Sequence, residues 1–539
     1  MWRARTLTSA TAVALVLVAG CTAMPHYGPP STRTYYVSAG GDDSAQGTSK
    51  DDAWRSLARA GRAQLRPGDR LLLAGGDRFT GTITVGGDEA GSAEQPVILG
   101  SYGSGRATIV ATDSAGISVH NTAGVEIRDL VLRGRGTARS HQAGVNLYHD
   151  TSDGGRLRHV TVSDIDASGF QVGIGVGSTH AGTGFADVTV RRAELHGNQD
   201  AGLLTYGPDF VPARPAYAHE NIDIRDVHAY DNAGDPDAVY RPTGSGIVLG
   251  GVRDATVRDS SAHDNGSRAP ANAYYGPAGI WAWDSRGVLI EHSSAYRNHT
   301  GTRTDGAGFG LDTSVFDSTL QYNLSFENDG GGYYVFSRWQ HPHRDNVIRY
   351  NISSNDGRKL PHNGALTVNG SHIGNLQIYQ NTVVMARASA GPGTVVRLRP
   401  HNSGVTIRNN LFVSDGYPFV VADADLSTNQ VLFQGNQFHA ATGQWTARWD
   451  DRLYMALATW RNATGQERLD NRPTGTTASP CFDAGPLPVV ATPSDARRLV
   501  PDCPHAGLDL RARFGTAQVA DDYFGRPVTT PPNTGAAQP

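Results

Sequence analysis

Residues 279–283 read Gly-Ile-Trp-Ala-Trp, and close variants of this stretch recur about every thirty residues along the chain. Each variant begins with glycine and alternates an apolar residue with a variable one, the period-two pattern of a strand with one buried face. The eight copies begin at Gly144, Gly173, Gly202, Gly246, Gly279, Gly308, Gly332 and Gly364. Short strands at near-constant intervals predict a solenoid, in which each coil packs on its neighbours.

Two columns of asparagines support the same interpretation. Residues 319–323 (Thr-Leu-Gln-Tyr-Asn) and 347–351 (Val-Ile-Arg-Tyr-Asn) end alike, and the terminal asparagine recurs further along the chain. Stacked coils place such residues about 4.8 Å apart, so their side-chain amides can hydrogen-bond in a ladder. The columns are Asn323, Asn351, Asn381, Asn410 and Asn436, and Asn232, Asn265, Asn298 and Asn328. We expect them to be solenoid turns and assign them no catalytic role.

Coils of this length with glycine-led turns and asparagine ladders are those of a right-handed parallel β-helix, and the chain resembles the pectin-lyase-like superfamily. Residues 34–43 (Thr-Tyr-Tyr-Val-Ser-Ala-Gly-Gly-Asp-Asp), 53–57 (Ala-Trp-Arg-Ser-Leu) and 67–73 (Pro-Gly-Asp-Arg-Leu-Leu-Leu) resemble the opening of many secreted members. The resemblance covers about residues 34–440. It implies an all-β fold with a first strand, an amphipathic capping helix near residues 52–64, and then the coils.

The ends of the chain indicate export. Arg3 and Arg5 precede an uncharged run from Leu7 to Gly20, which fits a signal peptide and is too short for a membrane-spanning helix. The run ends in Val18-Ala19-Gly20-Cys21, which resembles a lipobox and predicts a lipid on Cys21 and an extracytoplasmic location at the cell membrane. Cys481 and Cys503 can pair as a disulfide there.

The expected organisation follows from these signals. The segments are a lipoprotein signal peptide (1–20), a tether (21–34), the N-terminal strand, helix cap and first coils (35–100), the β-helix core (101–440), a C-terminal cap region with one short helix (441–528) and a disordered tail (529–539). With 47 basic and 51 acidic residues the net charge is −4, which argues against a nucleic-acid partner. We expect a monomer that meets the membrane only through its N-terminal lipid.

The alternation also predicts which side chains point outward from the repeated strands. One outward column holds Asn146, Gly175, Leu204, Val248, Trp281, Gly310, Tyr334 and Leu366, and the other holds Tyr148, Gly177, Tyr206, Gly250, Trp283, Asp312, Phe336 and Val368. The four rings Trp281, Trp283, Tyr334 and Phe336 bracket a coil that carries glycine and aspartate. Exposed rings on such a face suit stacking on sugars. We expect these rings and Arg338 to bind the substrate.

Four aspartates concentrate on the same coils. They are Asp284, Asp305, Asp312 and Asp329. Asp305 and Asp329 each stand three residues before a strand glycine, so their Cα atoms should lie about 5 Å apart, with a shared proton or a cation between the carboxylates. Asp312, outward at a strand end, is the strongest candidate; the alternative is a salt bridge to Arg338 or Arg344.

These residues favour a glycoside hydrolase that acts on a polysaccharide or oligosaccharide, with Asp312 and Asp305 as the acid–base pair and Asp284 and Asp329 as the next candidates. No cofactor is then required. The chain lacks the Gly-His-Gly motif of the polygalacturonase group.

Two alternatives remain open at this point. A Ca²⁺-dependent lyase, eliminating across a uronate, would use Lys359 or an arginine as base, and the acidic cluster could bind the ion. A non-catalytic glycan-binding solenoid would need the rings but not the aspartates.

Overall fold

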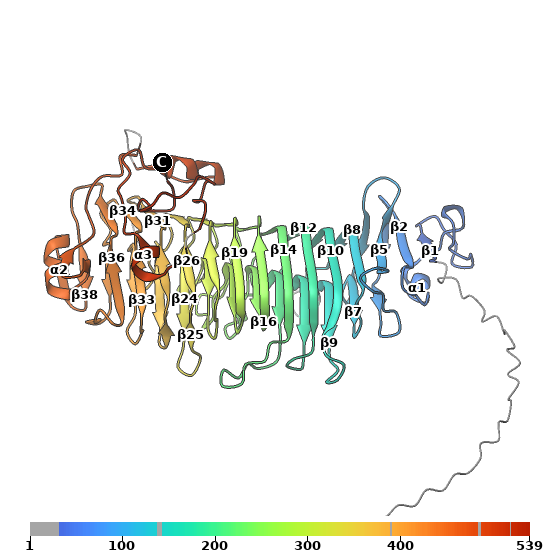
Figure 1. Ribbon diagram of the computed structural model, residues 1–539. Helices are drawn as coiled ribbons and strands as arrows, with labels where there is room; N and C mark the ends of the chain where they lie inside the picture. The colour runs from blue at the N-terminus through green and yellow to red at the C-terminus, as the bar shows by residue number, and fades with distance from the viewer. Residues whose placement is uncertain (1–31, 137–142, 389–390, 483–486, 518, 539) are drawn as a thin grey trace, which may run out of the picture.

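The computed structural model describes residues 32–136, 143–388, 391–482, 487–517 and 519–538. Here the chain forms one elongated stack of β-coils, with the N-terminal strand β1 (Thr34–Val37) at one end and β38 (Ala447–Trp449) near the other (Figure 1). The predicted signal peptide, the lipidation site Cys21 and all but the end of the predicted tether lie outside the described residues. Within the described ranges, no helix is both long and apolar enough to cross a bilayer.

Two long sheets run along the stack, and each coil contributes strands to both. Sheet B has 14 strands that pair in chain order, and all its pairs are parallel except the last. Its strands are β4 (Ile83–Val85), β7 (Ile117–His120), β9 (Ala143–His149), β11 (Val172–Ser178), β13 (Ala201–Tyr206), β15 (Ser245–Gly250), β18 (Ala278–Trp283), β21 (Ala307–Leu311), β24 (Tyr333–Ser337), β28 (Leu366–Gly370), β32 (Val396–Leu398), β35 (Val420–Ala422), β38 and β39 (Arg452–Tyr454).

Sheet A has 23 strands. They are β1, β2 (Arg70–Ala74), β3 (Arg78–Thr80), β5 (Val97–Tyr102), β6 (Ala107–Val110), β8 (Val125–Arg133), β10 (Leu157–Ser168), β12 (Phe185–His196), β14 (His219–Tyr230), β16 (Val252–Arg258), β17 (Ser261–His263), β19 (Arg286–Glu291), β20 (Ser294–Tyr296), β22 (Thr319–Gln321), β23 (Leu324–Phe326), β26 (Val347–Arg349), β27 (Ile352–Ser354), β30 (Gln377–Tyr379), β31 (Thr382–Met385), β33 (Val405–Arg408), β34 (Leu411–Ser414), β36 (Val431–Gln434) and β37 (Gln437–Ala440). Two small pairs, β25 (His343–Arg344) with β29 (Ile373–Gly374) and β40 (Arg468–Leu469) with β41 (Arg472–Pro473), complete the strands.

The asparagine ladders are present inside the stack. Asn323 Nδ2 donates to Asn351 Oδ1 at 3.1 Å, and the same bond repeats through Asn381 and Asn410 to Asn436 at 2.9 to 3.0 Å. The column from Asn232 to Asn328 forms the same amide-to-amide bonds, with Nδ2 to Oδ1 distances of 2.8 to 2.9 Å. All these side chains are buried, so the ladders satisfy the turns without water.

One strand differs in register from the prediction. Leu366 pairs with Tyr333 and Val368 pairs with Val335, so both side chains face the core, where they are 1% and 0% exposed. Thr367 and Asn369 take the outward positions instead. Tyr333 N bonds to Ala365 O, so Ala365, not Gly364, follows Gly332 in the column. A slip of one residue exchanges the two faces of a strand.

The N-terminal cap is shorter than predicted. Its α-helix α1 spans only Leu57–Ala60, after a 3₁₀ turn at Lys50–Asp52. Trp54, which the prediction placed inside the helix, is extended and forms a parallel bridge with Val37. Ser56 caps the start of the helix, because its hydroxyl accepts from Arg59 N at 3.1 Å, and Gly61 caps its end. The stacked rings of Tyr35 and Trp54 cover this end.

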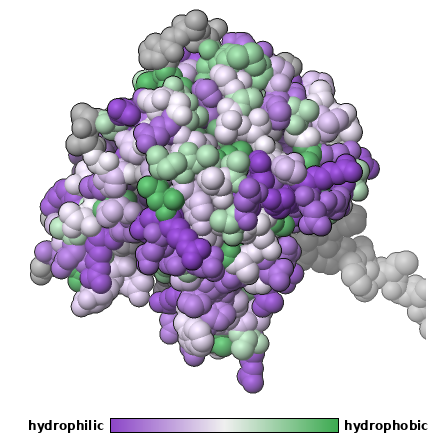
Figure 2. Space-filling view, turned by 90° about the vertical axis from the view of Figure 1, so that its left-hand side faces the viewer, coloured by the Kyte–Doolittle hydropathy of each residue, from purple (hydrophilic) through white to green (hydrophobic). Residues whose placement is uncertain are grey.

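The C-terminal cap contains the expected short helix, α2 (Leu457–Thr464), together with a 3₁₀ helix (Pro493–Leu499) and α3 (Leu510–Phe514). Trp460 of α2 is fully buried against the rings of Phe433, Trp445 and Trp449. Figure 2 looks onto this end of the stack and shows hydrophilic residues over much of it. The cap thus closes the apolar interior against solvent.

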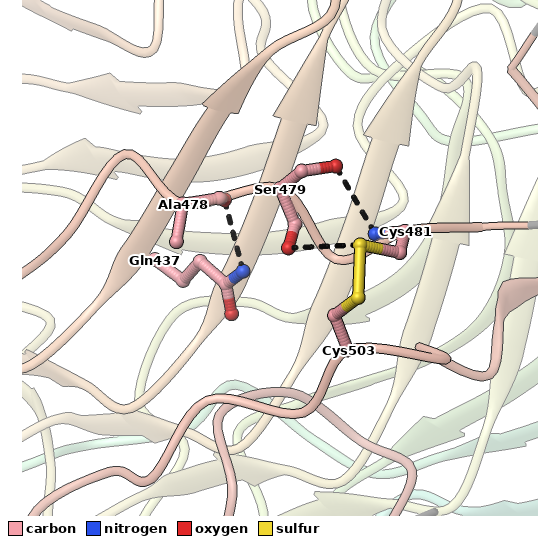
Figure 3. The surroundings of a disulfide bond; sticks show 5 residues. All are labelled: Gln437, Ala478, Ser479, Cys481 and Cys503. Atoms are coloured by element: carbon pink, nitrogen blue, oxygen red, sulfur yellow. Dashed lines mark hydrogen bonds between the residues drawn. A yellow bond between two sulfur atoms is a disulfide. The ribbon is translucent and has the colours of Figure 1, made fainter.

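Cys481 and Cys503 form a disulfide with a Cα–Cα distance of 5.2 Å (Figure 3). Just before it, Ala478 O accepts from Gln437 Nε2 of β37 at 3.0 Å, which ties the segment to sheet A.

Residues 529–538, predicted as a disordered tail, are ordered in the structure. Ala536 is fully buried and its N donates to Thr382 Oγ1 of β31 at 2.9 Å, while Gln380 Nε2 donates to Gly535 O at 3.0 Å. The reason is an apolar stretch on the outer face of sheet A, which includes Leu324 and Phe326 and which this segment helps to cover.

Candidate active site

A cavity of about 340 Å³ opens on the outer face of sheet B, over β18, β21 and β24. Its lining combines most of the residues predicted to act on a glycan with residues of the loops that precede β15, β18 and β21. The lining residues are Tyr240, Arg241, Pro242, Tyr274, Tyr275, Gly276, Trp281, Trp283, Thr304, Asp305, Asp312, Thr313, Phe336 and Arg338.

Trp281, Asp305 and Asp312 also line a small adjoining pocket, whose floor includes Gly310 and Tyr334. Strand pairing places Gly310 between Trp281 and Tyr334. A Cβ on Gly310 would lie 3.2 Å from Trp281 Cβ, so the absence of a side chain there leaves the hollow between the two rings. Trp281 and Tyr334 are only 7% and 6% exposed, and they are therefore less open than predicted. Trp283 and Phe336 are half-buried beside them.

The walls come from loops that precede the strands of sheet B. The exposed ring of Tyr240 stacks on Tyr274 at 5.1 Å, and the guanidinium of Arg303 lies 3.9 Å from the centre of the Tyr274 ring. On the other side, Arg338 Nη1 donates to Tyr275 Oη at 3.4 Å. Sequence reasoning missed these tyrosines, and the tandem Tyr274-Tyr275 before Gly276-Pro277 was the signal available for them.

Asp305 and Asp312 flank β21 and both line the cavity. Asp305 occupies a turn with φ of 59°, where its carboxylate accepts from Gly276 N at 2.7 Å and Thr304 Oγ1 at 3.1 Å. Asp312 accepts from its neighbour Thr313 N at 2.6 Å. Across the residues that the structure describes, no ion pair includes Asp312, so neither Arg338 nor Arg344 neutralises it by contact.

Burial raises the pKa of both carboxyl groups. The pKa of Asp305 rises to about 6. That of Asp312 rises to about 8, through burial first and then through the negative charges of Asp305 and Asp284. Because the two groups interact, they titrate as a pair, and at neutral pH the pair holds about one proton. Of the two, Asp312 has the higher pKa because the negative charges of Asp305 and Asp284 both act on it.

Asp284 lies next to this pair, at the end of β18. Its N donates to Thr313 O at 2.8 Å, its side chain is 6% exposed, and its Oδ1 has no hydrogen-bond partner among the described residues. Burial raises its pKa to about 6, and a hydrogen bond from Ser314 acts in the opposite direction. Asp284 does not line the cavity, so it acts on Asp312 through its charge.

Asp329 and Lys359 pair with each other and lie outside the cavity lining. Gly330 N bonds to Gly306 O, so the turns of Asp305 and Asp329 are adjacent, as predicted, but their side chains have different partners. Asp329 accepts from Lys359 Nζ at 2.7 Å and from Thr300 N at 2.9 Å. Burial alone would raise the pKa of Asp329, but hydrogen bonds from His299 and Lys359 hold it below its usual value.

Lys359→Ala tests whether this lysine acts as a base. Its Nζ already bonds to Asp329 and to Thr300 O at 2.5 Å, so we expect cleavage of a glycan to stay within about threefold of wild type, at a cost of about 1 kcal/mol in stability. Initial rates and denaturant unfolding of the two proteins measure both effects. A loss of cleavage in a folded Lys359→Ala protein would favour the lyase alternative.

Within the described ranges, no group of three or more His, Cys, Asp and Glu side chains could hold a metal ion.

A family model for the right handed beta helix region matches residues 237–412. The chain is a right-handed parallel β-helix. The match spans the coils that carry the cavity, from the loop of Tyr240 to β34. The fold agrees with the resemblance to pectin-lyase-like proteins.

Two similar proteins share a name. A Lacto-N-biosidase of Bifidobacterium longum subsp. longum is 26% identical over 484 aligned residues, which cover 71% of this chain and 29% of that protein. A crystal structure of the GH136 lacto-N-biosidase from Eubacterium ramulus is 19% identical, with a TM-score of 0.51, and the match covers 68% of this chain and 65% of that one. This chain thus matches only 29% of the length of the curated relative and 65% of the length of the solved structure.

Proposed function

We propose that the protein is a glycoside hydrolase that cleaves a glycan bound in the cavity over β21, with Asp305 and Asp312 as its two catalytic carboxyl groups. The observation that carries the proposal is the pairing of these aspartates in one cavity floored by aromatic rings. Glycoside hydrolysis needs one carboxylic acid to protonate the leaving oxygen and one carboxylate to act as base or nucleophile. A buried pair that holds one proton supplies both.

The aromatic lining supports a sugar as the bound group. Trp281, Trp283 and Phe336 line the cavity, and Tyr334 lines the small pocket that adjoins it. Rings of this kind pack against the C–H faces of sugars while their polar atoms remain hydrogen-bonded. Tyr334 Oη, for example, accepts from Asn369 Nδ2 at 2.6 Å.

The similarity to two lacto-N-biosidases favours hydrolysis over elimination, and it suggests an oligosaccharide with a lacto-N-biose unit as the first substrate to test. The lyase alternative receives less support because Lys359 is paired with Asp329 away from the cavity. The binding-module alternative does not account for two carboxyl groups with raised pKa values that line the same cavity as the rings.

We also propose that the enzyme works outside the cytoplasm and that a lipid attached to Cys21 anchors it to the membrane. The disulfide between Cys481 and Cys503 supports this location, because such bonds persist in oxidising compartments. Globomycin treatment of cells that express the full chain, followed by fractionation, tests it: the anchored form should give way to an uncleaved precursor.

The activity test uses protein that lacks residues 1–21, with and without a chelator. Its substrates are p-nitrophenyl β-lacto-N-bioside, lacto-N-tetraose and a panel of plant and microbial polysaccharides. We expect new reducing ends without the ultraviolet absorbance of an unsaturated uronate, and no effect of the chelator. Ultraviolet absorbance that the chelator abolishes would contradict the proposal and support the lyase.

The pair also predicts how activity depends on pH. Asp305 must lose its proton and Asp312 must keep its own, so kcat/KM should fall below about pH 6 and above about pH 8. A series of rates between pH 4 and 10 on one substrate checks this bell shape. A profile that keeps rising through the alkaline range would mean that no carboxylic acid donates the proton.

A further inference from the structure

The outer face of sheet B changes character beyond the cavity, toward the C-terminal cap. In the column of Tyr334 the next outward residues are Thr367 and Arg397, and in the column of Phe336 they are Asn369 and then Arg399. The backbone bond from Arg399 N to Val368 O fixes the second assignment. The surface therefore passes from aromatic to basic along one line of strands, from β24 to β32.

Three guanidinium groups gather there around one carboxylate. Asp423 lies 2.6 Å from Arg397, 2.9 Å from Arg399 and 3.6 Å from Arg448 of β38. We name this set of four residues the arginine patch. One carboxylate balances one guanidinium, so the patch carries an excess of about two positive charges.

The excess charge acts on a neighbouring side chain. Burial lowers the pKa of His362, and the charges of Arg399 and Arg397 lower it further. The Asp423 carboxylate does not cancel this effect, and its own pKa is held low by hydrogen bonds from Arg399 and Arg397 against the effect of burial. A site that repels a proton in this way attracts an anion.

The guanidinium groups are positioned and accessible. The side chains of Arg399 and Arg448 are 43% and 45% exposed, whereas that of Arg397 is 11% exposed and forms an ion pair with Asp423. Arg399 Nε also donates to Asn369 Oδ1 at 3.2 Å, and Asn369 in turn bonds to Tyr334 Oη. A hydrogen-bonded chain thus joins the patch to Tyr334, which lines the pocket adjoining the cavity. From Asp312 to Arg399 there are three steps between neighbouring coils, which together span about 14 Å.

We infer that the arginine patch binds an anionic group, a carboxylate or a sulfate, on a sugar of the same glycan that occupies the cavity. The inference rests on the proposed function, and it gives the substrate a second feature: an acidic sugar a short distance from the cleaved bond. Arginine forks suit carboxylate and sulfate groups because they donate two parallel hydrogen bonds.

Binding measurements on the uncleaving Asp312→Asn protein test the inference. The probes, matched in length, are a neutral galacto-oligosaccharide, an oligogalacturonide that carries only carboxylates, and a κ-carrageenan oligosaccharide that carries only sulfates. Calorimetry measures the binding of each at low and high salt. We expect at least one acidic probe to bind more tightly than the neutral one, and to lose this advantage at high salt. The comparison of the two acidic probes shows whether carboxylate or sulfate is preferred.

Variants then locate the effect. Arg399→Gln with Arg448→Gln should weaken binding of the preferred acidic probe about tenfold and leave the neutral probe unchanged. Asp423→Asn should strengthen acidic binding, a gain that a purely structural role of the cluster would not produce. The matched control is Arg225→Gln on sheet A, whose side chain is also 45% exposed and also contacts an aspartate, and it should change nothing.

Equal binding of acidic and neutral probes to the starting protein, or binding of no acidic probe, overturns the inference. An unchanged affinity in the folded double variant does so as well. Failure of the proposed function has a different signature, because wild-type protein would then bind glycans without cleaving any of them.

Discussion

Asp312→Asn is expected to lower kcat/KM for glycan cleavage by about 10³-fold, with the coils intact. In the proposed mechanism Asp312, whose pKa is raised to about 8, donates the proton, and an amide of the same shape cannot release one. Among the described residues, its carboxylate accepts a hydrogen bond from the adjacent Thr313 N alone, and an asparagine oxygen can accept the same bond. Initial rates on the best substrate, together with circular dichroism, measure both parts of the expectation.

Two companions make this result interpretable. Asp305→Asn should cause a loss of similar size, because the second carboxylate would be missing. Asp317→Asn, on the same coil but 44% exposed and paired with Arg286, should keep wild-type rates. If azide rescues Asp312→Ala or Asp305→Ala, the configuration of the glycosyl azide distinguishes the roles: loss of the nucleophile gives the inverted product and loss of the acid gives the retained one. Wild-type activity in a folded Asp312→Asn protein would remove this residue from the mechanism.

Asn381→Ala should have the largest effect on stability, a loss of about 3 kcal/mol in the free energy of unfolding. Asn381 is fully buried, and its Nδ2 donates to Asn410 Oδ1 and to Ile348 O. Its Oδ1 accepts from the N and the Nδ2 of Asn351. Alanine leaves these groups without partners inside the stack, in a column where each coil depends on the next.

Denaturant unfolding of wild type and Asn381→Ala measures the loss. The control is Asn462→Ala, which removes an exposed amide on helix α2 and should stay within about 0.5 kcal/mol. Equal stability of Asn381→Ala and wild type would show that the ladder does not hold the coils together.

The fold was predictable because its pattern repeats. Glycine-led strands and asparagine columns recur at nearly constant spacing, and each repeat is independent evidence for the same coil. The prediction was wrong where the spacing changes. The strand β28 is shifted by one residue relative to the predicted register, so Leu366 and Val368 turn inward. The residues of the strand itself do not indicate this shift.

The caps and the tail show a second limit. Trp54 was placed in a helix by its spacing, but its ring closes the end of the stack, and the extended backbone that allows this depends on contacts with Tyr35. Residues 529–538 have the composition of a disordered segment, yet they cover an apolar patch formed by distant coils. Tertiary contacts decide both cases.

The candidate site was predictable in part. The alternation identified Asp312 and the four rings as outward residues, and the coil positions drew attention to Asp305. Neither pattern could show that Asp329 pairs with Lys359, because that contact joins residues of different coils. The tyrosine walls belong to loops without periodicity, and their paths depend on the packing of Tyr240 on Tyr274.

The most direct test of the central claim is to run the cleavage in heavy-oxygen water and weigh the products by mass spectrometry. Hydrolysis with Asp305 and Asp312 predicts one heavy oxygen at the new reducing end, and product formation that is about 10³-fold slower in Asp312→Asn. Products that carry no heavy oxygen and contain a double bond would contradict the account, since they arise by elimination.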